Sequence, residues 1–323
     1  MKDFSPAYGV VPVLITTFKQ NKEIDWVAYD ALIDWHVEQG VSGLFINCGS
    51  SESLFLTEDE ALAIARAAVK RAEGRVNVLA GSTIYGPNGD TFEECIRLNI
   101  EKTRRMADTG VDGVFLTAPE VVPEDLESLD EPMLQYHLEI HDATDCPLYL
   151  YEIPRAPRSY KFSPEVFARL AQEERFIGIK DTSSRGKLPM AEGLAPVKAK
   201  LEATDNIKIL QAHNKWILES LRMGCTGGCN TGANVASGVE AKMILHWEAG
   251  DDESAEILQD RLTRITEMVG YGYTVSVKIA LRMMGLPIEP VARNRDVEFS
   301  AEQMGVIEEM VKLIQDTNAE FSP

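Results

Sequence analysis

The chain has 323 residues, of which 45% are hydrophobic and 26% charged, and its formal net charge at pH 7 is −19. This length suits one α/β barrel with an added segment, and so acidic a chain is not expected to bind nucleic acid or an anionic membrane, because both are negative themselves. Five scattered cysteines, no apolar signal core and no apolar run of about 18 residues favour a cytoplasmic protein with reduced thiols and no membrane partner.

Short apolar runs and amphipathic stretches alternate along the first 250 residues. The predicted strands are 9–17, 43–48, 76–81, 112–117, 146–151, 176–182, 207–211 and 226–230. The predicted helices that follow them are 25–38, 57–72, 91–108, 132–141, 164–172, 188–201, 215–223 and 235–249. Eight strand-then-helix units imply parallel strands joined by right-handed crossovers, so we expect a closed (β/α)8 TIM barrel. A doubly wound sheet is the alternative, but no Gly-rich dinucleotide fingerprint follows the first strand.

The pattern changes after Gly250, where the sequence predicts helices only, at 252–268, 274–284 and 300–316. We therefore divide the chain into a barrel catalytic domain, 1–250, and a C-terminal helical segment, 251–323. We expect this segment to cover part of the barrel or to contact another subunit.

Lys180 ends a short apolar run, in which Ile177 and Ile179 flank a glycine. Such a run is typical of a buried parallel strand. Burial disfavours an ammonium and lowers its pKa, so that the free amine is able to attack a carbonyl and form a Schiff base. Most lysines at strand ends instead extend to solvent, so this residue taken alone favours a solvent-exposed side chain, and the rest of the chain has to decide.

The ends of two other predicted strands carry polar groups, and the chemistry of a TIM barrel sits at such ends. After the second strand, residues 48–52 read Cys-Gly-Ser-Ser-Glu, which is either a pocket for a carboxylate or a plain serine-rich turn. In the fifth strand, Tyr149 and Tyr151 share a face by alternation. Tyr151 is placed either to relay protons near Lys180 or to act as a core tyrosine with a backbone partner.

Together these segments resemble the dihydrodipicolinate synthase and N-acetylneuraminate lyase superfamily, over nearly the full chain. The segments are Gly49-Ser50-Ser51-Glu52, Tyr151-Glu152-Ile153-Pro154, Ile177-Gly178-Ile179-Lys180-Asp181-Thr182, Gly224-Cys225-Thr226-Gly227, Ala233-Asn234-Val235, Gly250-Asp251, Val277-Lys278 and Gly285-Leu286-Pro287. Each motif is weak alone, but their order and their places at strand ends make the resemblance specific.

The resemblance implies a class I lyase in which Lys180 forms a Schiff base with the 2-oxo carbon of pyruvate or a related acid. It implies that Tyr151 is the proton relay, and that Gly49, Ser50 and Ser51 hold the carboxylate while the Cys229 backbone lines the floor. It implies no metal or organic cofactor, a small 2-oxo acid as the partner molecule, and a homo-oligomer, either a tetramer or a dimer.

The chain departs from the pattern of the family at two loops. Ser51 stands where a glycine usually precedes the glutamate. After the fourth strand, members that make dihydrodipicolinate usually have two tyrosines behind a proline, whereas here Glu120 and Val121 follow Pro119. One of those tyrosines joins the proton relay, so this relay lacks a member.

A third departure lies after the fifth strand, where the family arginine is replaced by Ala156. Arg155 and Arg158 lie nearby in the sequence as substitutes for it. Four residues instead offer polar groups for the hydroxyls of a sugar acid or, equally, are solvated loop residues: Glu120, Glu152, Arg155 and Asn230. The missing tyrosine and the missing arginine both count against lysine biosynthesis.

We therefore expect a Schiff-base aldolase or dehydratase that acts on a 2-oxo acid such as a 2-keto-3-deoxy sugar acid. Dihydrodipicolinate synthase is the nearest alternative, and a non-catalytic paralogue that binds 2-oxo acids is another. Metal-dependent aldolase chemistry would need ligands at strand ends, where only His213 lies; we interpret His137 and His141, four residues apart on one helix, as a surface pair. The acceptor aldehyde, the direction of flux and the choice between cleavage and dehydration stay open.

Overall fold

A computed structural model describes residues 7–82, 88–124, 126–152, 160–184 and 188–321. Eight parallel strands form one sheet in the order β1-β8-β7-β6-β5-β4-β3-β2. The strands are β1 (Gly9–Val10), β2 (Gly43–Ile46), β3 (Asn77–Gly81), β4 (Gly113–Thr117), β5 (Leu148–Tyr151), β6 (Phe176–Asp181), β7 (Lys208–Gln211) and β8 (Gly227–Gly228). A parallel bridge joins Val13, three residues beyond β1, to Phe45 of β2 and closes the ring. The predicted TIM barrel is confirmed.

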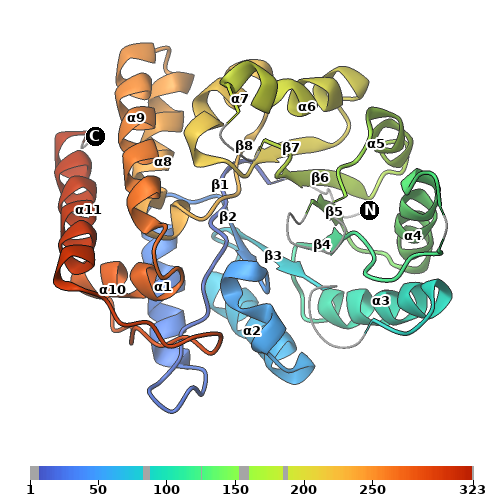
Figure 1. Ribbon diagram of the computed structural model, residues 1–323, viewed down its shortest axis with the longest axis horizontal. Helices are drawn as coiled ribbons and strands as arrows, with labels where there is room; N and C mark the ends of the chain where they lie inside the picture. Colours follow the sequence, from blue (N-terminus) through green and yellow to red (C-terminus); the bar gives the residue numbers. More distant parts are fainter. Residues whose placement is uncertain (1–6, 83–87, 125, 153–159, 185–187, 322–323) are drawn as a thin grey trace.

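The helices surround this ring, as Figure 1 shows. They are α1 (Trp26–Glu38), α2 (Glu58–Ala72), α3 (Phe92–Ala107), α4 (Asp130–Ala143), α5 (Pro164–Leu170), α6 (Met190–Ala203), α7 (Ile217–Met223) and α8 (Ala233–Glu248). Side-chain caps set several starts: Asp25 accepts from the Ala28 N–H, and Thr57 and Glu60 form the reciprocal capping box that the sequence predicts. Such local signals explain why the predicted boundaries of these helices agree closely with the observed ones.

Aromatic side chains fill the inside of the barrel. The rings of Phe45 and Phe115 have centroids 4.0 Å apart, and Phe115 lies 4.9 Å from Tyr149. A Cβ on Gly178 would collide with the Tyr149 ring, so the glycine makes room for this core side chain. Tyr149 accepts a hydrogen bond from the Ala7 N–H at 2.8 Å, as expected of a core tyrosine with a backbone partner.

The eighth strand is shorter than predicted. The sequence predicts a strand over 226–230, but only Gly227 and Gly228 pair with β1 and β7. A Cβ on Gly227 would collide with the Gly9 backbone, so only glycine allows this close pairing. Beyond it, the Asn230 side chain caps the turn into α8 by accepting from the Ala233 N–H at 2.8 Å.

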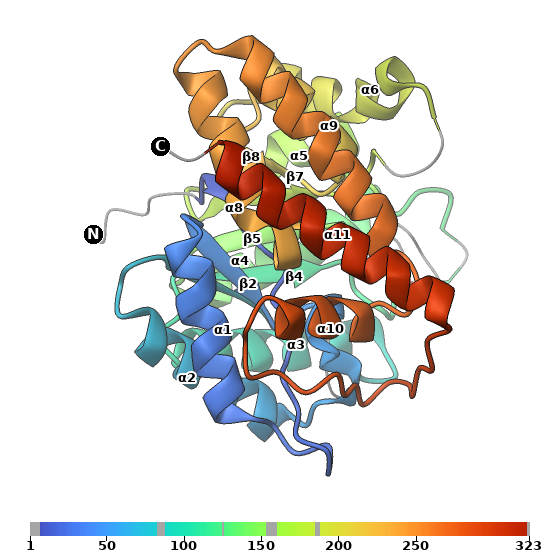
Figure 2. The ribbon, with the colours of Figure 1, turned by 90° about the vertical axis from the view of Figure 1, so that its left-hand side faces the viewer.

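The C-terminal helices α9 (Asp252–Val269), α10 (Val275–Met283) and α11 (Ala301–Glu320) gather on one side of the barrel (Figures 1 and 2). α9 packs along α8, and α11 runs beside α9 and also contacts α8. The segment therefore covers part of the barrel, although the division of the chain at residue 250 stays a prediction. Among the described residues, no helix has both the length and the apolar character needed to cross a membrane.

Candidate active site

Lys180 and Tyr151 lie side by side at the ends of neighbouring strands. β5 and β6 pair in register at these two residues, and the Lys180 Nζ lies 3.5 Å from the Tyr151 Oη. The ammonium nitrogen also lies 4.6 Å from the centroid of the Tyr151 ring and 5.2 Å from that of Phe45. Lys180 is only 5% exposed, so it does not extend to solvent.

The neighbours of Lys180 set the charge of the pair. Burial by itself lowers the pKa of Lys180, but attraction to Tyr151, Cys229 and Cys48 outweighs burial and leaves this pKa raised. The expectation that burial lowers the pKa of Lys180 below its ordinary value is therefore wrong. Burial raises the pKa of Tyr151 and raises that of the Cys229 thiol to about 12. Near neutral pH the resting pair is thus an ammonium beside a neutral phenol.

The two serines of the loop after β2 have different surroundings. Ser51 Oγ donates to the Leu14 carbonyl at 2.6 Å and accepts from the Cys48 N–H at 3.1 Å, so its hydroxyl is engaged inside the loop. Ser50 is 8% exposed, and its Oγ accepts from Tyr273 at 2.7 Å. Gly49 is exposed, and a Cβ there would meet no described atom within 4 Å. Of the two predicted hydroxyls, only that of Ser50 is left for a ligand.

Glu52 ties the same loop to the C-terminal segment. Its carboxylate accepts from Lys278 Nζ at 3.1 Å, from Thr274 Oγ1 at 3.1 Å, and from the Arg293 and Asn294 N–H groups at 2.7 and 3.0 Å. Glu52 and Lys278 are both fully buried at their side chains. The loop that carries Ser50 is therefore positioned by the segment beyond α9.

A buried ionic cluster lies directly behind the pair. Lys200 of α6 donates to Glu152 Oε1 and to Asp181 Oδ2, each at 2.6 Å. All three side chains are at most 2% exposed. Burial, together with the Asp181 charge, raises the pKa of Glu152 to about 7. Because Glu152 follows Tyr151 and Asp181 follows Lys180, the cluster anchors both strand ends.

The polar groups expected to meet a sugar acid are mostly engaged elsewhere. Glu152 belongs to the ionic cluster, and Asn230 donates to Glu240 at 2.8 Å and is 1% exposed, so these two expectations are wrong. Glu120 accepts from Asn88 Nδ2 at 2.6 Å. The arginines at 155 and 158, with Ala156, lie outside the described residues.

The histidines do not form a metal site in the described part of the chain, where no group of three or more His, Cys, Asp or Glu side chains is arranged to hold an ion. The interpretation of His137 and His141 as a surface pair is wrong: they are 0% and 5% exposed. Both rings pack against Phe176 of β6. The spacing of two residues on a helix does not reveal which face of the helix lies against the barrel. His213 stacks on Trp216, with ring centroids 4.7 Å apart.

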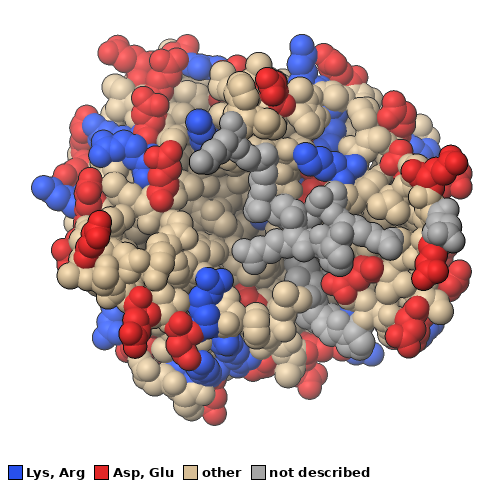
Figure 3. All heavy atoms as spheres, viewed as in Figure 1, with Lys and Arg blue, Asp and Glu red and all other residues tan. Residues whose placement is uncertain are grey.

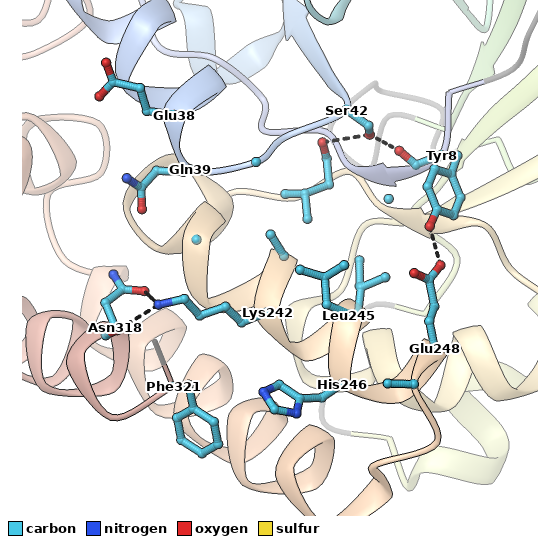
Figure 4. A pocket seen from close by; sticks show the side chains of 17 residues that line it. Tyr8, Glu38, Gln39, Ser42, Lys242, Leu245, His246, Glu248, Asn318 and Phe321 are labelled. Atoms are coloured by element: carbon cyan, nitrogen blue, oxygen red, sulfur yellow. Dashed lines mark hydrogen bonds between the residues drawn. The ribbon is translucent and has the colours of Figure 1, made fainter. Parts of the chain in front are cut away.

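A cavity of about 790 Å³ lies away from Lys180, at the end of the barrel where the strands begin (Figure 4). Tyr8 and Ser42, which precede β1 and β2, face Lys242 and Glu248 of α8 across it. Tyr8 donates to the Glu248 carboxylate, and Lys242 donates to Asn318 Oδ1 at 2.9 Å. Chemistry in a TIM barrel occurs at the opposite end, so this cavity is separate from the candidate site.

Tyr273 is the polar contact of this site that the sequence did not predict. It comes from the link between α9 and α10, and no periodicity or motif around it signals a place beside Ser50. The predicted Lys180, Tyr151, Ser50 and Cys229 do lie together at the barrel, and Cys229 is fully buried in the same inner cluster as Tyr151.

Comparison with known proteins gives a consistent result. The Dihydrodipicolinate synthetase family matches residues 6–314. The 4-hydroxy-tetrahydrodipicolinate synthase of Oceanobacillus iheyensis is 29% identical over 296 residues, which cover 91% of this chain and 93% of that protein. The dihydrodipicolinate synthase DapA-2 of Bacillus anthracis has a TM-score of 0.81 at 24% identity, covering 97% of this chain and 99% of that one. YagE of E. coli, solved in complex with pyruvate, has a TM-score of 0.79 at 22% identity, covering 96% and 98%. Both structures support the fold alone.

Proposed function

The chain belongs to the dihydrodipicolinate synthetase family and is an enzyme of the lyase class, and we propose that Lys180 forms a Schiff base with pyruvate. The observation that carries this proposal is the buried Lys180 Nζ, 3.5 Å from the Tyr151 Oη. A buried amine beside a phenol provides a nucleophile and a proton donor at one place.

In the proposed reaction, the neutral Lys180 amine attacks C2 of pyruvate and forms a carbinolamine. Tyr151 gives a proton to the departing hydroxyl, water leaves, and a protonated imine forms on Lys180. The imine draws electrons from C3, so that the Tyr151 phenolate takes a C3 proton and an enamine forms. The enamine adds to the carbon of an aldehyde, whose oxygen receives the proton from Tyr151, and hydrolysis of the product imine later returns a proton to the phenolate. Hydrolysis of the new imine frees the product and restores the amine. Cleavage follows the same steps in reverse.

For the finer activity we propose the condensation that yields 4-hydroxy-tetrahydrodipicolinate as the first reaction to test. The relatives' names support it better than they support our expectation of a sugar acid. The engagement of Glu152 and Asn230 inside the protein also removes two groups from the sugar-acid interpretation. A 2-keto-3-deoxy sugar acid is the second candidate, because Glu120 and Val121 stand where the tyrosines of dihydrodipicolinate synthases are expected.

The assembly and the location are further parts of the proposal. We propose a homo-oligomer, because the family resemblance implies one. We also propose that the protein works in the cytoplasm, where thiols stay reduced, since all five cysteines are buried free thiols.

Borohydride trapping tests the imine. Incubation with pyruvate and borohydride should add the mass of reduced pyruvate at Lys180, and Lys180→Ala should show no adduct and no turnover. Tyr151→Phe should slow turnover by about 10²- to 10⁴-fold, the usual contribution of a positioned acid–base group. Substantial turnover by Lys180→Ala would rule out the mechanism, and an unchanged rate in Tyr151→Phe would remove Tyr151 from it. Assays of pyruvate with the aldehyde of each candidate reaction then show whether the enzyme makes 4-hydroxy-tetrahydrodipicolinate or acts on a 2-keto-3-deoxy sugar acid.

A further inference from the structure

Tyr273 brings a phenol from the C-terminal segment to the barrel mouth. Its Oη donates to Ser50 Oγ at 2.7 Å, although 223 positions separate the two residues in the chain. The Tyr151 and Cys48 groups also act on the pKa of Tyr273, which burial raises, so the phenol lies within the electrostatic reach of the site. The role inferred below rests on the proposed function, because it concerns the acid that would bind beside Lys180.

The direction of the hydrogen bond is fixed by Asn234 on the other side of the phenol. The Asn234 amide nitrogen faces two backbone carbonyls, those of Val13 at 2.9 Å and Thr231 at 3.3 Å, which sets the orientation of its NH₂ group. The same nitrogen lies 3.2 Å from the Tyr273 Oη. Two NH₂ hydrogens thus serve three acceptors, of which the Thr231 carbonyl at 3.3 Å is the most distant. Because an amide nitrogen does not accept, Tyr273 is unable to donate to Asn234 and directs its own hydrogen to Ser50.

Ser50 consequently uses a lone pair for Tyr273 and keeps its own hydrogen for another acceptor. Ser50 is buried, with 8% of its surface exposed. Within the part of the chain that the structure describes, no acceptor receives its hydroxyl hydrogen. A buried hydroxyl hydrogen without an acceptor is unfavourable, and a carboxylate oxygen of a ligand would satisfy it. Ser51 differs, because its hydroxyl already donates to Leu14.

We propose that Tyr273 is a positioning residue for the substrate carboxylate, which it prepares by turning the Ser50 hydroxyl hydrogen towards the site. The order of donors runs from Asn234 through Tyr273 to Ser50 and then to the carboxylate, and each bond in such a chain strengthens the next. The sequence between β4 and α4, where Pro119 precedes Glu120 and Val121, contains no tyrosine, so a different element provides the second phenol of this mouth.

Pyruvate affinity in a Lys180→Ala background tests the inference without the imine. Calorimetry should show that Tyr273→Phe weakens pyruvate binding about 3- to 10-fold, as expected for one lost hydrogen bond. Tyr271→Phe is the matched control, because Tyr271 is 53% exposed and packs against Phe299, and it should leave the affinity unchanged.

Adding Ser50→Ala makes the test specific. If Tyr273 acts through Ser50, the double substitution should lose no more affinity than Ser50→Ala alone. Three outcomes would each overturn the inference. The first is a double variant whose loss of pyruvate affinity equals the product of the two single losses. The second is an unchanged affinity in Tyr273→Phe, and the third is no saturable binding of pyruvate to Lys180→Ala.

Kinetics of the otherwise unaltered enzyme give a second readout. Tyr273→Phe should raise KM for pyruvate about 3- to 10-fold and leave kcat and its pH profile nearly unchanged, because the lost contact binds ground state and transition state alike. A fall in kcat at constant KM would overturn the positioning role. A wild-type enzyme that forms no borohydride adduct would contradict the proposed function. The pyruvate affinities measured in the Lys180→Ala background would still test the role of Tyr273, because they do not depend on the imine.

Discussion

The charge of Lys180 gives a pH dependence to the proposed chemistry. Only the neutral amine attacks pyruvate, and interaction with Tyr151, Cys229 and Cys48 holds the Lys180 pKa above its ordinary value despite burial. Below that pKa the neutral fraction increases about tenfold for each pH unit. We therefore expect the rate of imine formation at low pyruvate concentration to rise steadily from about pH 7 to about pH 9, measured by timed borohydride trapping.

Tyr151→Phe is the control for this profile. It removes the phenol that helps to raise the Lys180 pKa, so the profile should move towards lower pH while the rate itself falls. A flat profile in the wild type would show that the ammonium of Lys180 does not limit the reaction, and an unshifted profile in Tyr151→Phe would show that Tyr151 does not raise the Lys180 pKa.

The sequence was informative about the residues whose signals are local. Lys180 and Tyr151 ended apolar strands, and strand alternation placed Tyr151 inside the barrel. It did not reveal that the Ser51 hydroxyl is engaged by Leu14, nor that Tyr273, from the link between α9 and α10, lies beside Ser50. Such pairings depend on tertiary packing, which one sequence does not reveal.

At the scale of elements, capping and periodicity predicted the helices well, since those signals act within one turn of the chain. Strand ends were less certain, because Gly227 and Gly228 pair only where the Gly9 backbone comes close. The anchoring of α6 to the strand ends through Lys200 was also hidden, as its partners Glu152 and Asp181 are far from it in sequence.

Lys200→Met tests that anchor. It leaves two buried carboxylates without their cation, and breaking a buried pair in this way costs about 3–5 kcal/mol. We expect Tm to fall by roughly 5–15 °C, with reduced trapping at Lys180, because the ends of β5 and β6 lose their common anchor. The loss should be smaller near pH 5 than near pH 8, since protonation removes the repulsion and the pKa of Glu152 is already raised to about 7.

Lys198→Met is the matched control on the same helix. Lys198 lies 3.8 Å from Glu202 in a pair whose side chains are 67% and 68% exposed, so its loss should cost less than about 1 kcal/mol. Equal effects of the two substitutions would mean that the buried cluster does not anchor the strands.

For the whole molecule, the net charge of −19 sets how stability responds to salt. Acidic side chains are spread around the face shown in Figure 3, and their mutual repulsion disfavours the compact state. Salt screens such exposed charges, with a Debye length that falls from about 10 Å at 0.1 M to about 3 Å at 1 M. Buried pairs such as Glu52 with Lys278 are screened far less, so the stabilising contacts remain.

We therefore expect Tm at about pH 7.5 to rise between about 0.1 M and about 1 M potassium chloride, as measured by circular dichroism. The control uses the charge itself: the sequence pI is about 4.7, so near pH 5 the net charge is small and the same salt step should raise Tm much less. An equal rise at both pH values would show that the effect does not depend on the net charge, and would contradict a role for the negative surface.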